Sequence, residues 1–131
     1  LILAANHVEI FDNQIINNKS SGVGVISYYT TENPIKDKDY YPYPESITIH
    51  DNVFERESGR ATSKGRFGQM YKYKLRLGKN VPFIQWDGIV DDKNPNQVLC
   101  FKNNKNESFV NMDIGNNFKN VSRDGSKYAC K

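Results

Sequence analysis

Short runs in which apolar and polar residues alternate dominate this chain, and they predict β-strands. Val8 and Ile10, separated by one polar residue, lead into the pair Asp12-Asn13, and Ile15 follows. Alternate residues of a strand face the same side, so Val8 and Ile10 are expected to enter one interior. Asn and Asp tolerate the left-handed backbone conformation that a sharp corner requires. The segment is therefore predicted to be a strand, a corner and a second short strand that returns to the same interior.

The same pattern recurs 39 residues further along the chain. Position for position, the first copy is matched by Ile47, Ile49, Asp51, Asn52 and Phe54. Two weaker copies run from Val98 through Cys100 to Lys102-Asn103, and from Met112 through Ile114 to Asn116-Asn117. Repeats of this kind predict stacked coils, because one coil cannot bury its apolar face alone. Structural corner positions are expected at Asn13, Asn18, Asn52, Asn103 and Asn117.

Two long insertions are expected between the coils. Residues 1–97 are predicted to form coils with insertions at about 30–45 and 55–80. Prolines favour extended loop geometry in the first insertion. In the second, residues 70–77 alternate and predict one amphipathic strand. A last coil would expose apolar interior and unpaired strand edges, so residues 98–131 are predicted to hold a final coil and a cap.

The composition narrows the class of partner. The 131 residues include 18 basic and 15 acidic side chains, a net charge of +3 that is dispersed along the chain. A nucleic-acid-binding protein shows a stronger and more clustered basic footprint, so no nucleic-acid partner is expected. No apolar run approaches the length of a membrane-spanning helix, so no membrane span is expected. Because residues 1–5 lead directly into a strand pattern, the expected partner is the N-terminal remainder of a longer parent chain, or a larger assembly.

Two cysteines, Cys100 and Cys130, lie near the end of a polar chain. A disulfide between them would close a loop of roughly 30 residues and remove unfolded-state entropy worth about 3–4 kcal/mol. The alternative is two unrelated reduced thiols. The bridge is favoured, and it implies an oxidising, extracytoplasmic compartment, whether periplasmic, cell-surface or secreted.

Residues 8–24 and 47–59 resemble the repeats of right-handed parallel β-helix proteins. Those repeats carry an apolar-x-apolar-x-x-Asn-x-apolar coil, often followed by a glycine-led short strand such as Gly22-Val23-Gly24-Val25. The family includes pectate lyases, alginate epimerases and many envelope proteins. The chain also looks like the C-terminal end of the bacterial parallel β-helix domain proteins. The resemblance implies an all-β fold: the C-terminal coils of a right-handed parallel β-helix with long loop insertions and a capping segment.

Aromatic residues of the first insertion, together with one later tryptophan, are the first candidate ligand-binding group. They are Tyr40, Tyr41, Tyr43 and Trp86, with Tyr28 and Tyr29 just before the insertion. Flat rings with a polar tip suit the alternating apolar and hydroxyl faces of a sugar. The alternative is that the Tyr- and Pro-rich loop only covers the flank of the coils. A polysaccharide is the expected ligand.

A basic stretch that begins at Arg56 and Arg60 and extends to Lys79 is the second candidate. Its charges, with aromatic residues interleaved, would hold an anionic polymer such as a uronate polysaccharide. The alternative is the solvated face of an inserted loop.

Catalysis is not expected from this segment. Lyases and epimerases of this fold use a base beside a positive group or metal. The available groups are His7, His50, Asp12, Asp51, Asp87, Asp91, Asp92, Arg56 and Arg60. A residue type that recurs at equivalent corners is structural, since a catalytic group is needed once. Asp91-Asp92 beside Asp87 would offer oxygen ligands to a hard cation, but an exposed acidic turn is favoured, and neither metal nor cofactor is expected.

The sequence therefore predicts the C-terminal segment of a secreted or envelope protein that engages polysaccharide without itself being catalytic. One alternative is part of a polysaccharide lyase or uronate C5-epimerase. Another is a structural or adhesive component of a larger cell-surface assembly.

Overall fold

Strands in three parallel sheets make up most of the regular structure. The computed structural model describes residues 1–59, 61–74, 81–94 and 98–131. The first sheet has the order β1-β4-β7-β9, with β1 Ile2–Leu3, β4 Val23–Ile26, β7 Ile84–Trp86 and β9 Phe109–Asn111. The second has the order β2-β5-β8, with β2 Asn6–Phe11, β5 Glu45–His50 and β8 Leu99–Lys102. The third pairs β3 Gln14–Ile16 with β6 Val53–Glu55. The protein is thus all-β in character, with little helix.

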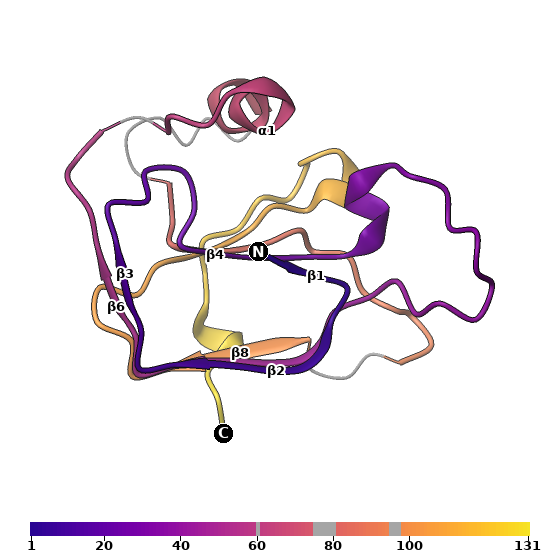
Figure 1. Cartoon of the computed structure of the whole chain (residues 1–131), viewed down its shortest axis with the longest axis horizontal. Helices are drawn as coiled ribbons and strands as arrows, with labels where there is room; N and C mark the ends of the chain where they lie inside the picture. Colours follow the sequence, from indigo (N-terminus) through magenta and orange to yellow (C-terminus); the bar gives the residue numbers. More distant parts are fainter. Residues whose placement is uncertain (60, 75–80, 95–97) are drawn as a thin grey trace.

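The chain visits the three sheets in rotation, so that successive passes lie side by side. The first pass is β1, β2 and β3, and the second pass is β4, β5 and β6. The third pass contains β7 and β8 and reaches the third sheet through a parallel bridge between Lys105 and Val53. In Figure 1 the strands β1 and β4 face β2 and β8 across the interior, and β3 and β6 close one side. Every pair between named strands is parallel.

The 39-residue repeat is confirmed by the strand register. Val8 pairs with Ile47 and Ile10 with Ile49, while Ile15 lies beside Phe54. As predicted, the side chains at these matched positions face one shared interior.

The predicted register of the third copy is wrong by one residue. Ile47 pairs with Leu99 and Ile49 with Phe101, so these two side chains enter the interior, and Cys100 faces out. Burying Leu99 and Phe101 removes more apolar surface from water than burying Val98 and Cys100 would, so this register is more stable. The prediction of a further copy from Met112 is also wrong, because Ile114–Asn116 forms a 3-10 turn, η3, and not a strand.

Stacked asparagines join the corners between the second and third sheets. Asn13 donates from its backbone N and from Nδ2 to Oδ1 of Asn52, at 3.1 and 3.0 Å. Asn52 donates in the same two ways to Oδ1 of Asn104, both at 3.0 Å. The residues that precede them have left-handed backbone conformations, with φ of 54° at Asp12, 53° at Asp51 and 55° at Asn103. Each corner is therefore a left-handed residue followed by an asparagine of the ladder.

The predicted corner residues fall into different roles in the structure. Asn13 and Asn52 lie in the ladder, while Asn103 takes the left-handed position and leaves the ladder to Asn104. Asn18 is exposed and donates to the carbonyl of Ile16 at 3.2 Å. Asn117 ends the η3 turn with φ of 54°.

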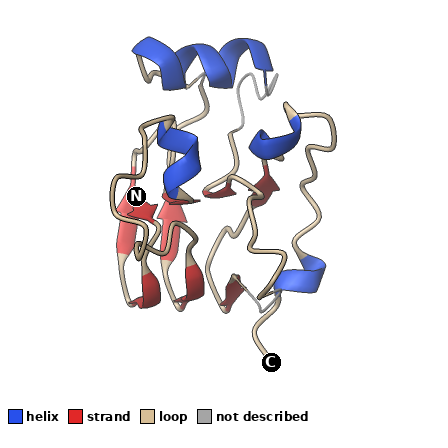
Figure 2. Cartoon of the chain, turned by 90° about the vertical axis from the view of Figure 1, so that its right-hand side faces the viewer, coloured by secondary structure: helices blue, strands red, loops and turns tan. Residues whose placement is uncertain are grey.

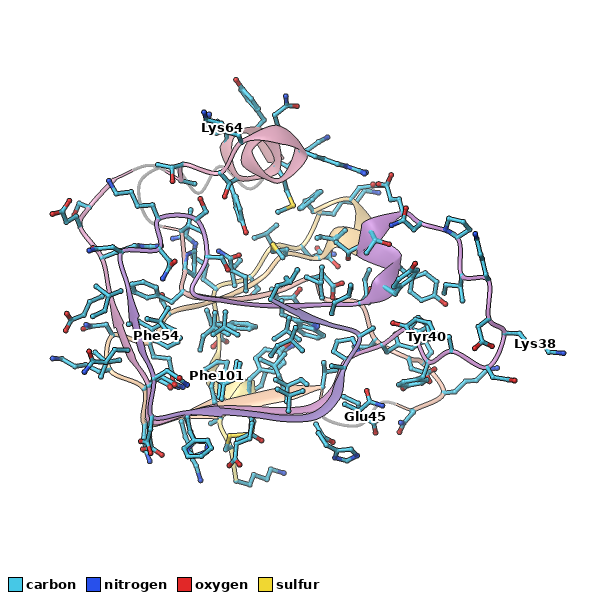
Figure 3. All side chains as sticks on the ribbon, in the orientation of Figure 1. Lys38, Tyr40, Glu45, Phe54, Lys64 and Phe101 are labelled. Carbon is cyan, nitrogen blue, oxygen red and sulfur yellow. A yellow bond between two sulfur atoms is a disulfide. The ribbon has the colours of Figure 1, made fainter. Side chains whose placement is uncertain are left out.

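The apolar core fills the space between the sheets. Ile47, Ile49, Phe54 and Leu99 are at most 1% exposed. The ring of Phe54 stacks on Phe83 with centroids 5.1 Å apart. Figure 3 shows Phe54 and Phe101 inside the ring of strands.

The second insertion is helical over residues 65–74, and the predicted strand over residues 70–77 is wrong for residues 70–74. Helix α1, Gly65–Gln69, continues into a π-helical turn, η2, Met70–Lys74; residues 75–77 lie outside the described ranges. Figure 2 shows this helix beyond one side of the stacked strands. The outer face of the first sheet presents Val110 and Met112, which pack with Tyr71 in a second buried cluster. An apolar face needs a covering layer, whereas an added strand would only have extended an edge.

The C-terminal segment folds back over the last pass. Cys100 and Cys130 form the predicted disulfide, with Cα atoms 4.9 Å apart. The 3-10 turn η4, Ser126–Tyr128, places the Tyr128 ring against Phe109, with centroids 4.8 Å apart. Gly125 is required nearby, because a Cβ there would lie 2.7 Å from the Phe101 ring. A parallel bridge between Phe101 and Ala129 adds one backbone contact beside β8.

Candidate functional site

Five tyrosines from two adjoining segments make two groups of ring contacts, called here together the tyrosine cluster. Its members are Tyr28 and Tyr29 on the 3-10 turn η1, Tyr28–Thr31, and Tyr40, Tyr41 and Tyr43 on the loop that follows. Tyr28 meets Tyr40 edge to face with centroids 5.3 Å apart. Tyr43 contacts both Tyr29 and Tyr41 at 5.4 Å. Figure 3 shows Tyr40 on the side of the molecule opposite β3 and β6.

A backbone hydrogen bond joins the two segments of the cluster. The carbonyl of Pro42 accepts a hydrogen bond from the backbone N of Tyr28 at 2.8 Å, and Pro42 and Pro44 are both buried. Against this base the rings differ in exposure: Tyr29 is 48% exposed and Tyr40 is 39% exposed, while Tyr41 and Tyr43 are half-buried. Tyr29 and Tyr40 are therefore the accessible rings. Tyr43, which packs on Tyr41, supports Tyr29, and Tyr28 supports Tyr40.

Carboxylates surround the supporting rings. The hydroxyl of Tyr41 donates to Oδ2 of Asp91 at 3.3 Å, and Asn94 donates to Oε1 of Glu45 at 3.1 Å. Burial raises the pKa of Tyr43 to about 12, and its neighbours Tyr29, Asp91 and Asp92 add to this effect. Burial likewise raises the pKa of Tyr41. Both phenols therefore stay protonated at neutral pH and remain hydrogen-bond donors.

The other predicted ligand-binding residues lie elsewhere. Trp86 is 5% exposed and meets Tyr128 edge to face in the core, so it does not join the surface. Strand β6 lies on the opposite side of the molecule from Tyr40 (Figures 1 and 3). Arg56 directly follows β6 in the chain, and its guanidinium lies 4.3 Å from the centre of the Phe83 ring. It also donates to the carbonyl of Val81. Arg60 lies outside the described residues.

Asp87 is a buried carboxylate whose bonds are structural. It accepts from the backbone N of Ser27 and from Oγ1 of Thr30, both at 2.6 Å, and from the backbone N of Ile89 at 3.1 Å. Burial raises the pKa of Asp87, and these three donors oppose that rise. The carboxylate ties the end of β7 to the start of η1, which carries Tyr28 and Tyr29.

His50 lies on the outer face of β5 between two carboxylates. Its Nδ1 is 2.5 Å from Oδ2 of Asp51, and its Nε2 is 2.8 Å from Oε1 of Glu9 on the neighbouring strand. The ring stacks on Phe11 at an interplanar angle of 5°. Among the described residues, no group of three His, Cys, Asp or Glu side chains is arranged to hold a metal ion.

His50 is expected to make stability depend on pH. Its hydrogen bonds to Asp51 and then Glu9 raise its pKa above 6.5 in the folded chain. A raised folded pKa contributes stability that is fully present below the unfolded value, and that contribution fades as the pH rises through the folded value. The stability advantage of the wild-type chain over His50→Gln should therefore be largest below pH 6.5 and decrease above it. Denaturant unfolding at several pH values measures this, and an advantage that grows with pH would contradict it.

A cavity of about 650 Å³ lies outside the sheets, beside the helical insertion. Its apolar walls come from segments far apart in sequence, and they include Leu3, Ile26, Met70, Ile114 and Phe118. An ion pair between Arg66 and Glu32 stands at its side, and both side chains are about two-thirds exposed. This cavity could not be predicted from the sequence, because residues far apart along the chain line it only once the protein is folded.

No protein-family model, curated protein or solved structure matches this chain. None of the helices described is long and apolar enough to cross a membrane.

Proposed function

We propose that this chain is a segment of a right-handed parallel β-helix that binds polysaccharide through the tyrosine cluster. The β-helix interpretation is supported by the rotation of the chain through three parallel sheets and by the 39-residue register. The cap interpretation of residues 98–131 is supported by the disulfide and by Tyr128, which packs on the last pass.

One observation carries the binding proposal: Tyr29 and Tyr40 expose their rings on a base of other aromatic rings and buried prolines. Rigid, exposed rings give contact area at a low cost in conformational entropy. Sugars present apolar C–H faces to such rings and hydroxyl groups to the polar side chains beside them. Asp91 and Glu45 lie close to the supporting rings and offer acceptors for those hydroxyls.

The same charges favour a neutral glycan over a uronate. Tyr41 and Tyr43 lie in the field of Asp91, with Glu45 or Asp92 adding to it. Like charges in a binding surface weaken association, so an anionic polymer is disfavoured at this place. Arg56, one of the described residues predicted to meet an anionic polymer, packs over the ring of Phe83 instead.

The disulfide supports an extracytoplasmic location, since such bonds persist in oxidising compartments. Of the candidate acid–base groups, Asp91 lies at the tyrosine cluster, where it accepts a hydrogen bond from Tyr41. Asp87 instead holds backbone and Thr30, and His50 lies on the outer face of β5. We therefore place this segment as a binding component and not as the catalytic centre of a lyase or epimerase.

The expected result is loss of glycan binding when the exposed rings are removed. Tyr29→Ala and Tyr40→Ala should each weaken binding to a neutral polysaccharide roughly tenfold, as expected for a lost ring contact of about 1.4 kcal/mol. Affinity electrophoresis in gels containing neutral glucans, mannans or xylans, with alginate and polygalacturonate in parallel, measures this.

Tyr73→Ala is the matched control, because Tyr73 is 75% exposed but lies on η2, outside the cluster. It should bind as the wild-type chain does. Failure of the wild-type chain to bind any glycan would refute the proposal. Preferential binding to alginate would refute the neutral-ligand assignment, and new ultraviolet absorbance from unsaturated products would favour a lyase.

A further inference from the structure

The first pass of the chain ends the stack with three open strand edges. β1 and β2 are the outermost strands of their sheets, and β3 pairs on one side only, with β6. Their partners β4, β5 and β6 all belong to the second pass, so the three open edges lie at the same end of the molecule. An open edge presents backbone N–H and C=O groups to any strand that approaches in register.

Apolar side chains at this end are only half covered. Val8, Ile10 and Ile15 are partly buried against the core, whereas the residues beside them, Ile47, Ile49 and Phe54, are at most 1% exposed. The difference arises because the residues of the second pass are covered from both sides. The first pass therefore carries the contact surface of a coil that has one neighbour.

The asparagine ladder is also open at this end. Each amide donates to Oδ1 of the next asparagine, from Asn13 to Asn52 and from Asn52 to Asn104. Among the described residues, Oδ1 of Asn13 accepts no such hydrogen bond. At the other end of the ladder, Nδ2 of Asn104 donates to Oε2 of Glu107 at 2.6 Å, so a carboxylate takes the acceptor place of a further asparagine. The ladder is terminated at one end and unfinished at the other.

We propose that the open end formed by β1, β2 and β3 binds a further polypeptide segment in parallel register. The segment has the pattern apolar-x-apolar-x-x-Asn-x-apolar. Its apolar residues cover Val8, Ile10 and Ile15, and its asparagine donates from backbone N and Nδ2 to Oδ1 of Asn13.

A second copy of this chain does not supply that segment by head-to-tail stacking. Its opposite end is covered by the C-terminal segment, where Tyr128 packs on Phe109 and the Cys100–Cys130 bond holds the chain in place. Glu107 further occupies the donor that a continuing ladder would use. Head-to-head pairing of two copies would set the strands antiparallel, and the two Asn13 side chains would then present the same open acceptor to each other.

A labelled peptide of residues 45–57 tests the proposal, because it contains the pattern with Asn52 in the donating position. Fluorescence polarisation should show saturable binding to the intact chain. The same peptide with Asn52→Ala should bind roughly fivefold more weakly, since the hydrogen bond from Nδ2 to Oδ1 of Asn13 is lost while the backbone N–H remains. Amide exchange should slow at β2 and β3 on peptide binding.

A chain variant with Val8→Lys provides the complementary change, because it places a charge on the inner side of the open edge. It should abolish binding while its unfolding curve shows that it still folds. Phe11→Ser, on the outer side of β2, is the matched control and should leave binding unchanged. Absence of peptide binding, or binding that survives both Asn52→Ala and Val8→Lys, would overturn the proposal. Dimerisation of the chain that Val8→Lys abolishes would overturn the choice of occupant in favour of a second copy.

Discussion

Phe54→Ala is expected to lower the free energy of unfolding by about 3–5 kcal/mol, the range for deleting a buried phenylalanine ring. Phe54 is fully buried, stacks on Phe83 and lies beside Ile15 of the preceding pass. Its removal would leave a cavity between the sheets that stiff neighbouring strands cannot close. Urea unfolding monitored by circular dichroism measures the change.

Phe11→Ala is the matched control for the same loss of atoms. Phe11 lies on the outer face of β2, is 49% exposed and contacts the His50 ring. Its replacement should cost less than about 1 kcal/mol. Equal losses for the two variants would mean that the inward and outward faces of these strands are assigned wrongly.

These two phenylalanines show why part of the fold could be predicted from the sequence. Alternation fixes which side of a strand is buried, and an identical pattern 39 residues on fixes which strands lie together. Both features are local in the sequence and need no knowledge of the tertiary structure. The register of Val8 with Ile47 followed from them.

The error at β8 has the opposite cause. Residues 98–102 contain four consecutive positions that accept burial, so the alternation does not select one register. The choice is made by partners distant in sequence: Cys100 must face outward to meet Cys130, and Phe101 packs under Gly125 and Tyr128. A shift of one residue reverses every side chain, which is why Asn104 and not Asn103 enters the ladder.

The helical insertion and the candidate site were harder still to predict from the sequence, because both depend on contacts between residues far apart along the chain. Tyr71 and its neighbours alternate as a strand would, yet their apolar surface is used to cover Val110 and Met112. Trp86 could not be distinguished from a surface aromatic, because its burial depends on Tyr128 in the last segment. The Tyr40, Tyr41 and Tyr43 loop was found from composition alone, but the exposure of Tyr29, which makes it an accessible ring, required the structure.

Removing the Cys100–Cys130 disulfide is also expected to cause a large loss of stability. Replacing both cysteines, Cys100→Ser with Cys130→Ser, should lower the free energy of unfolding by about 3–4 kcal/mol, because the unfolded chain regains the freedom of a loop of 30 residues. Among the described residues, backbone bonds between Asn111 of β9 and Ser122 and from Cys130 to Phe101 of β8 would then still hold the last segment.

The loss of stability should be largest in the part of the chain that the disulfide holds. Without the bond, Tyr128 can leave Phe109 and Trp86, and the end of the core becomes accessible to water. Amide exchange should therefore accelerate first at β9 and residues 122–130, while the β2–β5 pair exchanges only with global unfolding. Reduction of the wild-type chain should reproduce both effects, since it breaks the same bond without changing a residue. Uniform acceleration across β2 and β9 would instead show that the C-terminal segment and the stacked strands unfold as one cooperative unit.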